Sequence, residues 1–299
     1  MKKSVSMLLA ALMLTGALAG CGSSASTSDS QAEDGADSGV SGAITVISRE
    51  DGSGTRGAFI ELTGVEEKTA DGKKVDNTTA DAEIANKTDV VLTSVAGNEK
   101  AIGYISLGAL NDTVKAVKVD GAEATVDNVK AGAYKLSRPF NIATKGEPTG
   151  VAKDFINFIL SKEGQAVVTD NKYIAVNDAA ESFVSDGSSG QIAVGGSSSV
   201  SPVMEKLIEA YKSVNPNASI DLQTSDSTSG MTGAMDGTFA IGMASRELKD
   251  EEAAQLTGTA IALDGIAVIV NPASTIDELS MDQIKSIYVG DITDWGDLA

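Results

Sequence analysis

Apolar residues recur along this chain in two spacings from residue 43 onward. Short runs rich in Val and Ile predict strands at residues 43–47, 89–95, 101–105, 114–119, 191–194 and 261–270. Apolar residues three and four positions apart predict helices between them, at residues 151–160, 202–214 and after Ser280. Strands that alternate with helices favour an α/β fold.

Local signals mark where some of these helices begin and end. Pro202 suits a first helical turn, because its missing N–H has no helical partner there. Ser280 and Gln283 form a capping box, and Gly290 is a stop signal. Residues 179–190 are rich in Ser, Gly and acidic residues, so a linker or long surface loop is expected there.

The first residues predict the compartment. Lys2 and Lys3 precede an apolar run at residues 7–19, and small residues lead to Cys21, the single cysteine of the chain. The pattern resembles a bacterial lipoprotein signal over residues 1–21, with Cys21 lipidated and the protein extracytoplasmic and anchored to the cell membrane. The alternative is a free thiol at a chance position. Residues 22–41 lack large apolar residues and are expected to form a disordered tether.

Composition then narrows the class of function. The chain has 299 residues, a formal net charge of −19 and no histidine. Such acidity disfavours nucleic acid, and the missing histidine excludes Ser-His and Cys-His nucleophile pairs and His-ligated zinc. We therefore expect a binding protein rather than an enzyme, with no metal and no cofactor. A secreted hydrolase or phosphatase that uses one of the serines is the rival from another class.

Polar Ser, Gly and Thr clusters occupy three predicted strand-to-helix turns. The clusters are residues 48–56, 195–200 and 225–230. The first N–H groups of a helix lack partners and the helix dipole is positive there, so an anion is favoured at each turn. Each cluster alone could equally be a helix cap. No cluster has the Gly-Lys-Ser/Thr of a Walker A loop or Rossmann glycine spacing, which argues against a nucleotide.

Charged residues in the first cluster indicate how an oxyanion could be bound. Arg49 supplies a positive charge and a planar fork that can hold two oxygens of an oxyanion. Asp51 would either hold Arg49 in place or accept a hydrogen bond from a protonated oxyanion.

Five segments from these regions resemble one family, the phosphate-binding component of ABC-type phosphate importers, known as PstS. They read SREDGSGTRGAF, GGSSSVSPVMEKLIEAY, STSGMTGAMDGTFAIGMASREL, LDGIAVIVNP and LSMDQIKSIYVGDITDWGDL. The resemblance covers nearly all of residues 43–298.

The resemblance implies a type II periplasmic-binding-protein fold, with two α/β lobes joined by crossing strands and phosphate held between them. It implies that the protein works with membrane permease and ATPase subunits. We also expect a monomer that binds no nucleic acid. The phosphate-binding positions that it implies are Arg49, Asp51, Ser53, Gly54, Thr55, Ser198, Ser199, Ser227 and Ser245.

The chain departs from the family at one site residue. Ser245 stands where some members carry a second carboxylate, which puts strict selection of phosphate over sulfate in doubt. Binding of sulfate, molybdate or tungstate, and a phosphate sensor or surface protein without transport, therefore stay open.

The order of the segments also departs from the family. There the SVSP segment comes first and the ITDWGDL segment runs straight into SREDGSGTR, so this chain resembles a circular permutation. One lobe would comprise residues 42–138 and 266–299, and the other residues 139–265, with residues 179–190 joining the old ends. A remnant of a tandem gene is the alternative.

Overall fold

The computed structural model describes residues 41–298. The predicted signal peptide, the lipidation of Cys21 and all but the last residue of the predicted tether lie outside this range. Within it, no helix is long and apolar enough to cross a membrane.

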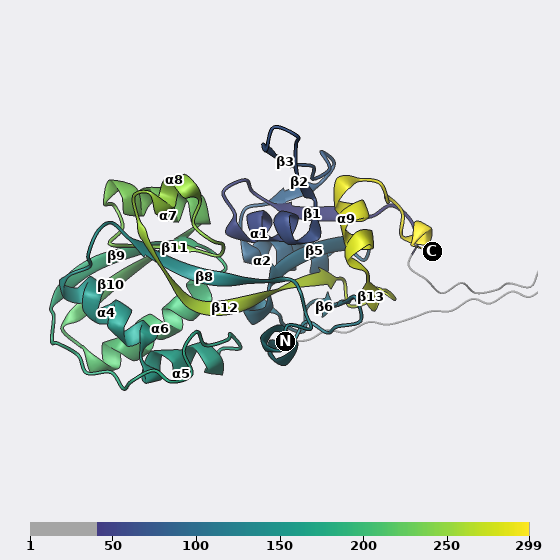
Figure 1. Ribbon diagram of the computed structural model, residues 1–299. Helices are drawn as coiled ribbons and strands as arrows, with labels where there is room; N and C mark the ends of the chain where they lie inside the picture. Colours follow the sequence, from purple (N-terminus) through teal and green to yellow (C-terminus); the bar gives the residue numbers. More distant parts are fainter. Residues whose placement is uncertain (1–40, 299) are drawn as a thin grey trace, which may run out of the picture. The chain divides into compact units, whose positions relative to one another are not determined.

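A mixed sheet of nine strands runs through the described residues (Figure 1). The strand order is β10-β9-β11-β8-β12-β5-β1-β4, and β6 also pairs with β12. The strands are β1 (Thr45–Arg49), β4 (Glu83–Ala85), β5 (Ala101–Ser106), β6 (Lys115–Ala116), β8 (Ser137–Thr144), β9 (Gly190–Ser197), β10 (Ala218–Ser225), β11 (Ile241–Ala244) and β12 (Thr257–Val270). Two separate pairs join β2 (Glu66–Lys68) to β3 (Lys74–Asp76) and β7 (Lys118–Val119) to β13 (Glu278–Leu279).

Helices occupy most of the connections between these strands. They are α1 (Gly54–Thr63), α2 (Thr88–Ala96), α3 (Val126–Lys130), α4 (Gly150–Leu160), α5 (Lys162–Asp170), α6 (Ser201–Val214), α7 (Ser227–Asp236), α8 (Asp250–Ala253) and α9 (Met281–Val289). The predictions of α4, α6 and α9 are confirmed. The capping box is present too, because Ser280 Oγ accepts from Gln283 N at 3.1 Å and Gln283 Oε1 accepts from Ser280 N at 2.8 Å. Gly290 ends α9 with a φ of 88°.

The strand prediction for residues 89–95 is wrong, because this segment lies in α2. Its apolar residues Val91, Leu92 and Val95 are buried on a helical spacing. The β-branched side chains favour a strand locally, but packing of this face against β5 and β1 stabilises a helix. The strand predicted at 114–119 is interrupted, and β6 and β7 are its two short pieces.

The two largest hydrophobic cores of the described residues include opposite ends of β12. The first surrounds Phe59, Tyr104 and Tyr288, whose rings contact one another, and the second surrounds Phe155 and Tyr211. Burying one such aromatic side chain contributes about 2–3 kcal/mol. We name the parts that contain these cores the Arg49 lobe and the Ser198 lobe. Their boundaries at residues 138/139 and 265/266 stay a prediction.

Strands β8 and β12 connect the two lobes. In Figure 1 they run side by side from one group of helices to the other. Arg138 on β8 lies opposite Asp264 on β12, and the two buried side chains pair at 3.2 Å. Burial raises the pKa of Asp264 to about 6, while Arg138 and a hydrogen bond from Ser106 oppose that rise.

The first and last described residues lie next to each other. Ala43 pairs with Asp294 as an isolated bridge, Ile44 N donates to Thr293 O at 2.8 Å, and Trp295 N donates to Gly42 O at 3.1 Å. A short connection could therefore join the two ends without rearranging the fold, as a permutation requires. Residues 180–189 form no helix or strand, although Phe183 contacts the ring of Phe158.

Candidate functional site

The three polar clusters are strand-to-helix turns, as predicted. The first connects β1 to α1, the second connects β9 to α6, and the third connects β10 to α7. In the Ser198 lobe, β9 pairs in parallel with β10 and β11, so the carboxyl ends of these strands lie at one edge of the sheet. Hydrogen bonds from Arg49 to Ser198 and between Thr55 and Ser199 bring the first cluster to that edge.

Arg49 is the last residue of β1 and is buried. Its Nη2 donates to Ser198 Oγ at 3.2 Å, across the two lobes, and its Nε donates to Ala85 O at 3.1 Å. Glu50 accepts from Nε and Nη2 at 2.8 Å each. The guanidinium is therefore held from its own lobe and directed at the second polar turn.

Tyr104 fixes the backbone that leads to Arg49. Its hydroxyl bonds to Ser48 Oγ at 2.9 Å and accepts from Arg49 N at 3.2 Å. Its ring stacks on Phe59 with centroids 3.9 Å apart. Burial raises the pKa of Tyr104 to about 12, so the phenol stays neutral and keeps its hydroxyl proton.

Buried hydroxyls connect the first and second turns across the lobes. Thr55 Oγ1 lies 2.8 Å from Ser199 Oγ. Thr88 Oγ1 lies 3.4 Å from Ser198 Oγ and 3.3 Å from Ser199 Oγ. Thr88 is the first residue of α2, and the strand prediction for the adjoining residues 89–95 concealed it.

A second hydroxyl group lies within the Ser198 lobe. Ser197 Oγ donates to Ser245 Oγ at 2.9 Å, and Ser227 Oγ accepts from Ser245 N at 3.1 Å. All three residues are buried. Gly54, the first residue of α1, faces Ser227 and Ser245 so closely that a β-carbon there would overlap with both hydroxyls. The start of α1 thus lies against hydroxyls from two turns of the other lobe.

Two predicted site residues have other contacts. Ser53 is buried and caps α1, since its Oγ accepts from Arg56 N at 3.3 Å. The Asp51 side chain is 96% exposed and pairs with Arg56 at 2.6 Å. The expectation that Asp51 holds Arg49 is therefore wrong, because Glu50 does so. Asp51 acts on the turn through Arg56, which also donates to Arg49 O at 2.9 Å.

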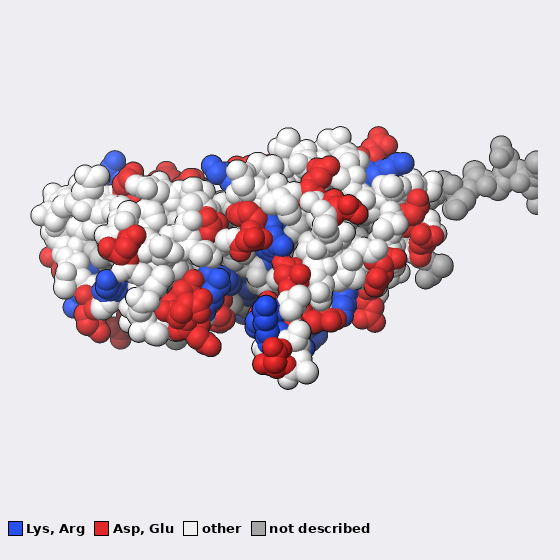
Figure 2. Space-filling model, turned by 90° about the horizontal axis from the view of Figure 1, so that it is seen from above, with Lys and Arg blue, Asp and Glu red and all other residues white. Residues whose placement is uncertain are grey.

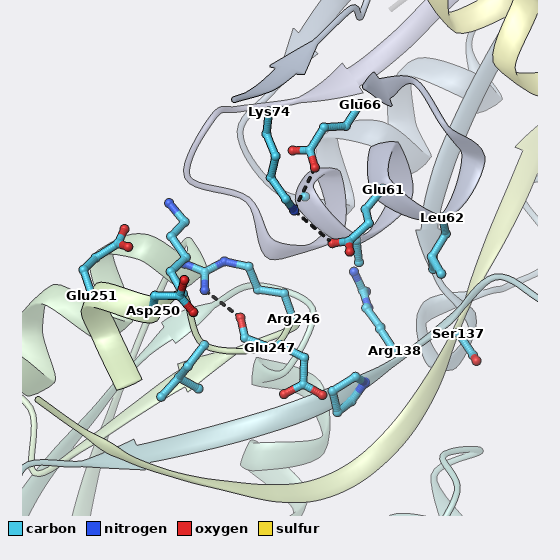
Figure 3. A pocket seen from close by; sticks show the side chains of 15 residues that line it. Glu61, Leu62, Glu66, Lys74, Ser137, Arg138, Arg246, Glu247, Asp250 and Glu251 are labelled. Atoms are coloured by element: carbon cyan, nitrogen blue, oxygen red, sulfur yellow. Dashed lines mark hydrogen bonds and ion pairs between the residues drawn. The ribbon is translucent and has the colours of Figure 1, made fainter. Parts of the chain in front are cut away.

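A groove of about 640 Å³ opens between the two lobes, and none of the predicted site residues lines it (Figure 3). Glu61, Glu66 and Lys74 line it from the Arg49 lobe, and residues 246–251 line it from the Ser198 lobe. Arg246 is held there by Glu252, with two oxygen–nitrogen distances of 2.7 and 2.8 Å. Burial raises the pKa of Glu252, but hydrogen bonds from Arg246 and from Lys249 N outweigh it, so this pKa lies below its ordinary value.

The charge around the groove is mixed. Figure 2 shows separate groups of acidic side chains across one face, and both acidic and basic side chains border the hollow near its middle. Within residues 41–298, no group of three or more His, Cys, Asp or Glu side chains could hold a metal ion. The chemistry that the clustered residues offer is hydrogen-bond donation from amides, hydroxyls and one guanidinium, which suits an oxyanion.

Comparison with known proteins agrees with this chemistry. The PBP superfamily domain matches residues 24–163 and 182–299. Phosphate-binding protein PstS 2 of Streptococcus agalactiae is 49% identical over 300 residues, covering 99% of this chain and 98% of that protein. The chain belongs to the PstS family. PstS 2 of Streptococcus pneumoniae is 47% identical over 296 residues and 99% of each chain.

A solved PstS-family structure shares the fold. The crystal structure of a phosphate-binding protein of a phosphate ABC transporter from S. pneumoniae matches with a TM-score of 0.69 and 49% identity. The match covers 86% of this chain and all of that one. The type II binding-protein fold is thereby confirmed.

The PstS 2 relatives also bear on the order of the segments. Their matches span 98% or 99% of their own lengths, so they share the order found here. An isolated remnant of a tandem gene would not be expected to match whole relatives in this way. The circular permutation itself stays a prediction from the sequence.

Proposed function

We propose that this PstS-family chain captures inorganic phosphate outside the cytoplasm and delivers it to the permease and ATPase subunits of an ABC importer. One observation carries the proposal: Arg49 and buried hydroxyls from three strand-to-helix turns converge from two lobes. The relatives that match over the whole chain are named as phosphate-binding proteins. In the predicted set, Arg49, Gly54, Thr55, Ser198, Ser199, Ser227 and Ser245 line the proposed site.

The proposed mechanism is capture by closure. An oxyanion that enters between the separated lobes meets the positive N-terminal ends of α1 and α7 and the guanidinium of Arg49. When the lobes close, the donors surround the anion and water leaves, which strengthens every charge-assisted hydrogen bond. Local donors can therefore outweigh the net charge of −19, which mainly slows the approach of anions at low salt.

We propose that the two lobes move relative to each other, with the boundaries predicted from the sequence. The cross-lobe contacts between Arg49 and Ser198 and between Thr55 and Ser199 form on closure. Movement would occur where β8 and β12 pass between the cores. We further propose that the chain acts as a monomer anchored through Cys21.

Binding without catalysis is the second part of the proposal. The chain has no histidine, and the clustered serines bond to other hydroxyls rather than to a base. A hydroxyl without a base is a weak nucleophile. Turnover of a phosphoester by the purified chain would favour the hydrolase alternative.

Selectivity among oxyanions depends on acceptors in the site. Ser245, in place of a carboxylate, offers a hydroxyl that can either donate or accept. A hydroxyl does not repel a fully deprotonated anion as a carboxylate would. Weaker rejection of sulfate is therefore the specific departure that we expect from this chain.

Calorimetric titration of the purified chain with phosphate, sulfate, molybdate and tungstate tests the proposal. Phosphate should bind with one site per chain, and at least about tenfold more tightly than sulfate, which corresponds to about 1.4 kcal/mol. Tighter binding of another oxyanion would indicate that this oxyanion, rather than phosphate, is the ligand. No heat with any of the four would end it. Loss of phosphate uptake on deletion of the gene would separate transport from a sensor role.

A further inference from the structure

Gly54 lies where the two lobes contact each other beside the proposed site. A β-carbon at this position would overlap first with Ser227 Oγ and would lie 2.8 Å from Ser245 Oγ and 3.1 Å from Arg246 Cγ. All three neighbours belong to the Ser198 lobe, whereas Gly54 begins α1 in the Arg49 lobe. A side chain at this position would therefore obstruct the closed arrangement.

The backbone itself does not require glycine at position 54. Gly54 is the first residue of α1 and is not one of the glycines with positive φ. Alanine could adopt this conformation and has the higher helix propensity. Position 54 has no space for a side chain on the side that faces the Ser198 lobe.

The neighbouring hydroxyls cannot easily move aside. Ser227 and Ser245 are fully buried, and Ser227 Oγ accepts from Ser245 N while Ser245 Oγ accepts from Ser197 Oγ. Rotating either side chain would break these bonds inside a packed region. Arg246 is fixed at its far end by the ion pair with Glu252.

We infer that Gly54 is a positioning residue that ties lobe closure to anion capture. Because position 54 has no side chain, the Ser227 and Ser245 hydroxyls can reach the N-terminal end of α1, and the donors of both lobes then form one site. The inference extends the proposed function, since it names the residue on which closure of the proposed site depends.

Neighbouring glycines support this interpretation and supply a control. At Gly52 the lobes also touch, because Thr228 N donates to Gly52 O at 3.1 Å and the Asp226 carboxylate faces its α-carbon. Gly57, one helical turn after Gly54, would place a β-carbon 3.7 Å from Arg246 Cδ, an ordinary contact. Gly57→Ala therefore makes the same chemical change on the same helix without the overlap.

A disulfide across the lobes measures closure without any ligand. Thr55 Oγ1 and Ser199 Oγ are 2.8 Å apart, so Thr55→Cys with Ser199→Cys places two thiols within reach when the lobes meet. The only other cysteine, Cys21, is replaced by serine. In this full-length parent, adding Gly54→Ala should slow disulfide formation at least about tenfold, whereas Gly57→Ala should change it less than about twofold. Equal rates for all three chains, or no disulfide in the parent, would overturn the inference.

A second arm separates closure from phosphate binding. In the chain without engineered cysteines, Gly54→Ala should weaken phosphate binding at least about tenfold, and Gly57→Ala should not. If the unmodified chain binds no phosphate, the proposed function fails, while the disulfide rates still decide the role of Gly54. If Gly54→Ala unfolds, adding Ser227→Ala and Ser245→Ala removes the two closest atoms and should restore the disulfide but not phosphate binding. Failure of that rescue would contradict the inference.

Discussion

Arg49 and Ser198 are 149 positions apart, yet the guanidinium of Arg49 donates to the hydroxyl of Ser198 at 3.2 Å. Arg49 ends β1 beside one hydrophobic core, and Ser198 follows β9 beside the other. The contact therefore depends on the arrangement of both lobes. It also brings the buried guanidinium to the polar turn before α6. A positive charge at this turn would bind the proposed phosphate.

Arg49→Ala should weaken phosphate binding at least about 100-fold, since charge-assisted hydrogen bonds contribute about 1.5–3 kcal/mol each. Calorimetric titration measures the loss. The substitution also leaves Glu50 unpaired near the anion, so Arg49→Gln combined with Glu50→Gln is the control. The loss should persist in that double variant. Affinity within about threefold of the unmodified chain would remove Arg49 from the site.

Thr88→Val should weaken phosphate binding about tenfold, mainly through faster dissociation. Valine keeps the shape of threonine but lacks the hydroxyl that contacts Ser198 and Ser199 across the lobes. Thr88→Ser restores the hydroxyl and should recover most of the affinity. Stopped-flow measurement of phosphate release distinguishes these cases. A valine variant that releases phosphate at the normal rate would show that Thr88 plays no part in closure.

Asp51→Asn should change phosphate affinity less than about threefold, because an exposed charge paired with Arg56 is screened by solvent. Titration at physiological ionic strength measures the effect. A tenfold loss would mean that Asp51 contacts the anion despite its exposed position.

Local signals explain what could be predicted from the sequence. Pro202, the Ser280–Gln283 box and Gly290 act within one or two helical turns, so α6 and α9 could be placed correctly. The polar turns were recognisable because strand and helix patterns flank each of them. The prediction that the three turns meet around one position rested on the family resemblance, because spacing along a chain does not show which turns converge.

Contacts between distant residues explain what was missed. Val91 and Val95 resemble strand residues until their burial against β5 and β1 is known, and this error concealed Thr88. Glu50 and Asp51 are adjacent acids, and only the direction of the turn decides that Glu50 pairs with Arg49. Ser197 ends β9 and points toward Ser245 in a different strand–helix turn, a contact without any sequence signal.

Glu252→Gln should lower the free energy of unfolding by about 3 kcal/mol at pH 7, because it leaves the nearly buried Arg246 without its partner charge. The pKa of Glu252 is lower in the folded chain than its ordinary value of 4.5. Its stabilising effect is therefore complete above pH 4.5 and is lost as the pH falls through the lower folded value. Urea unfolding of both chains from pH 7 to pH 3 should show the difference shrink below pH 4.5. A constant difference across this range would contradict the assignment.

A crystal structure of the chain with phosphate would show directly whether Arg49 and the buried hydroxyls form one anion site. One phosphate should lie between the lobes, with its oxygens accepting from the Arg49 guanidinium and from the hydroxyls of Ser198 and Ser227. The N-terminal end of α1 at Gly54 should face the same anion. A phosphate bound elsewhere, or a structure at saturating phosphate in which these groups are occupied only by one another, would contradict it.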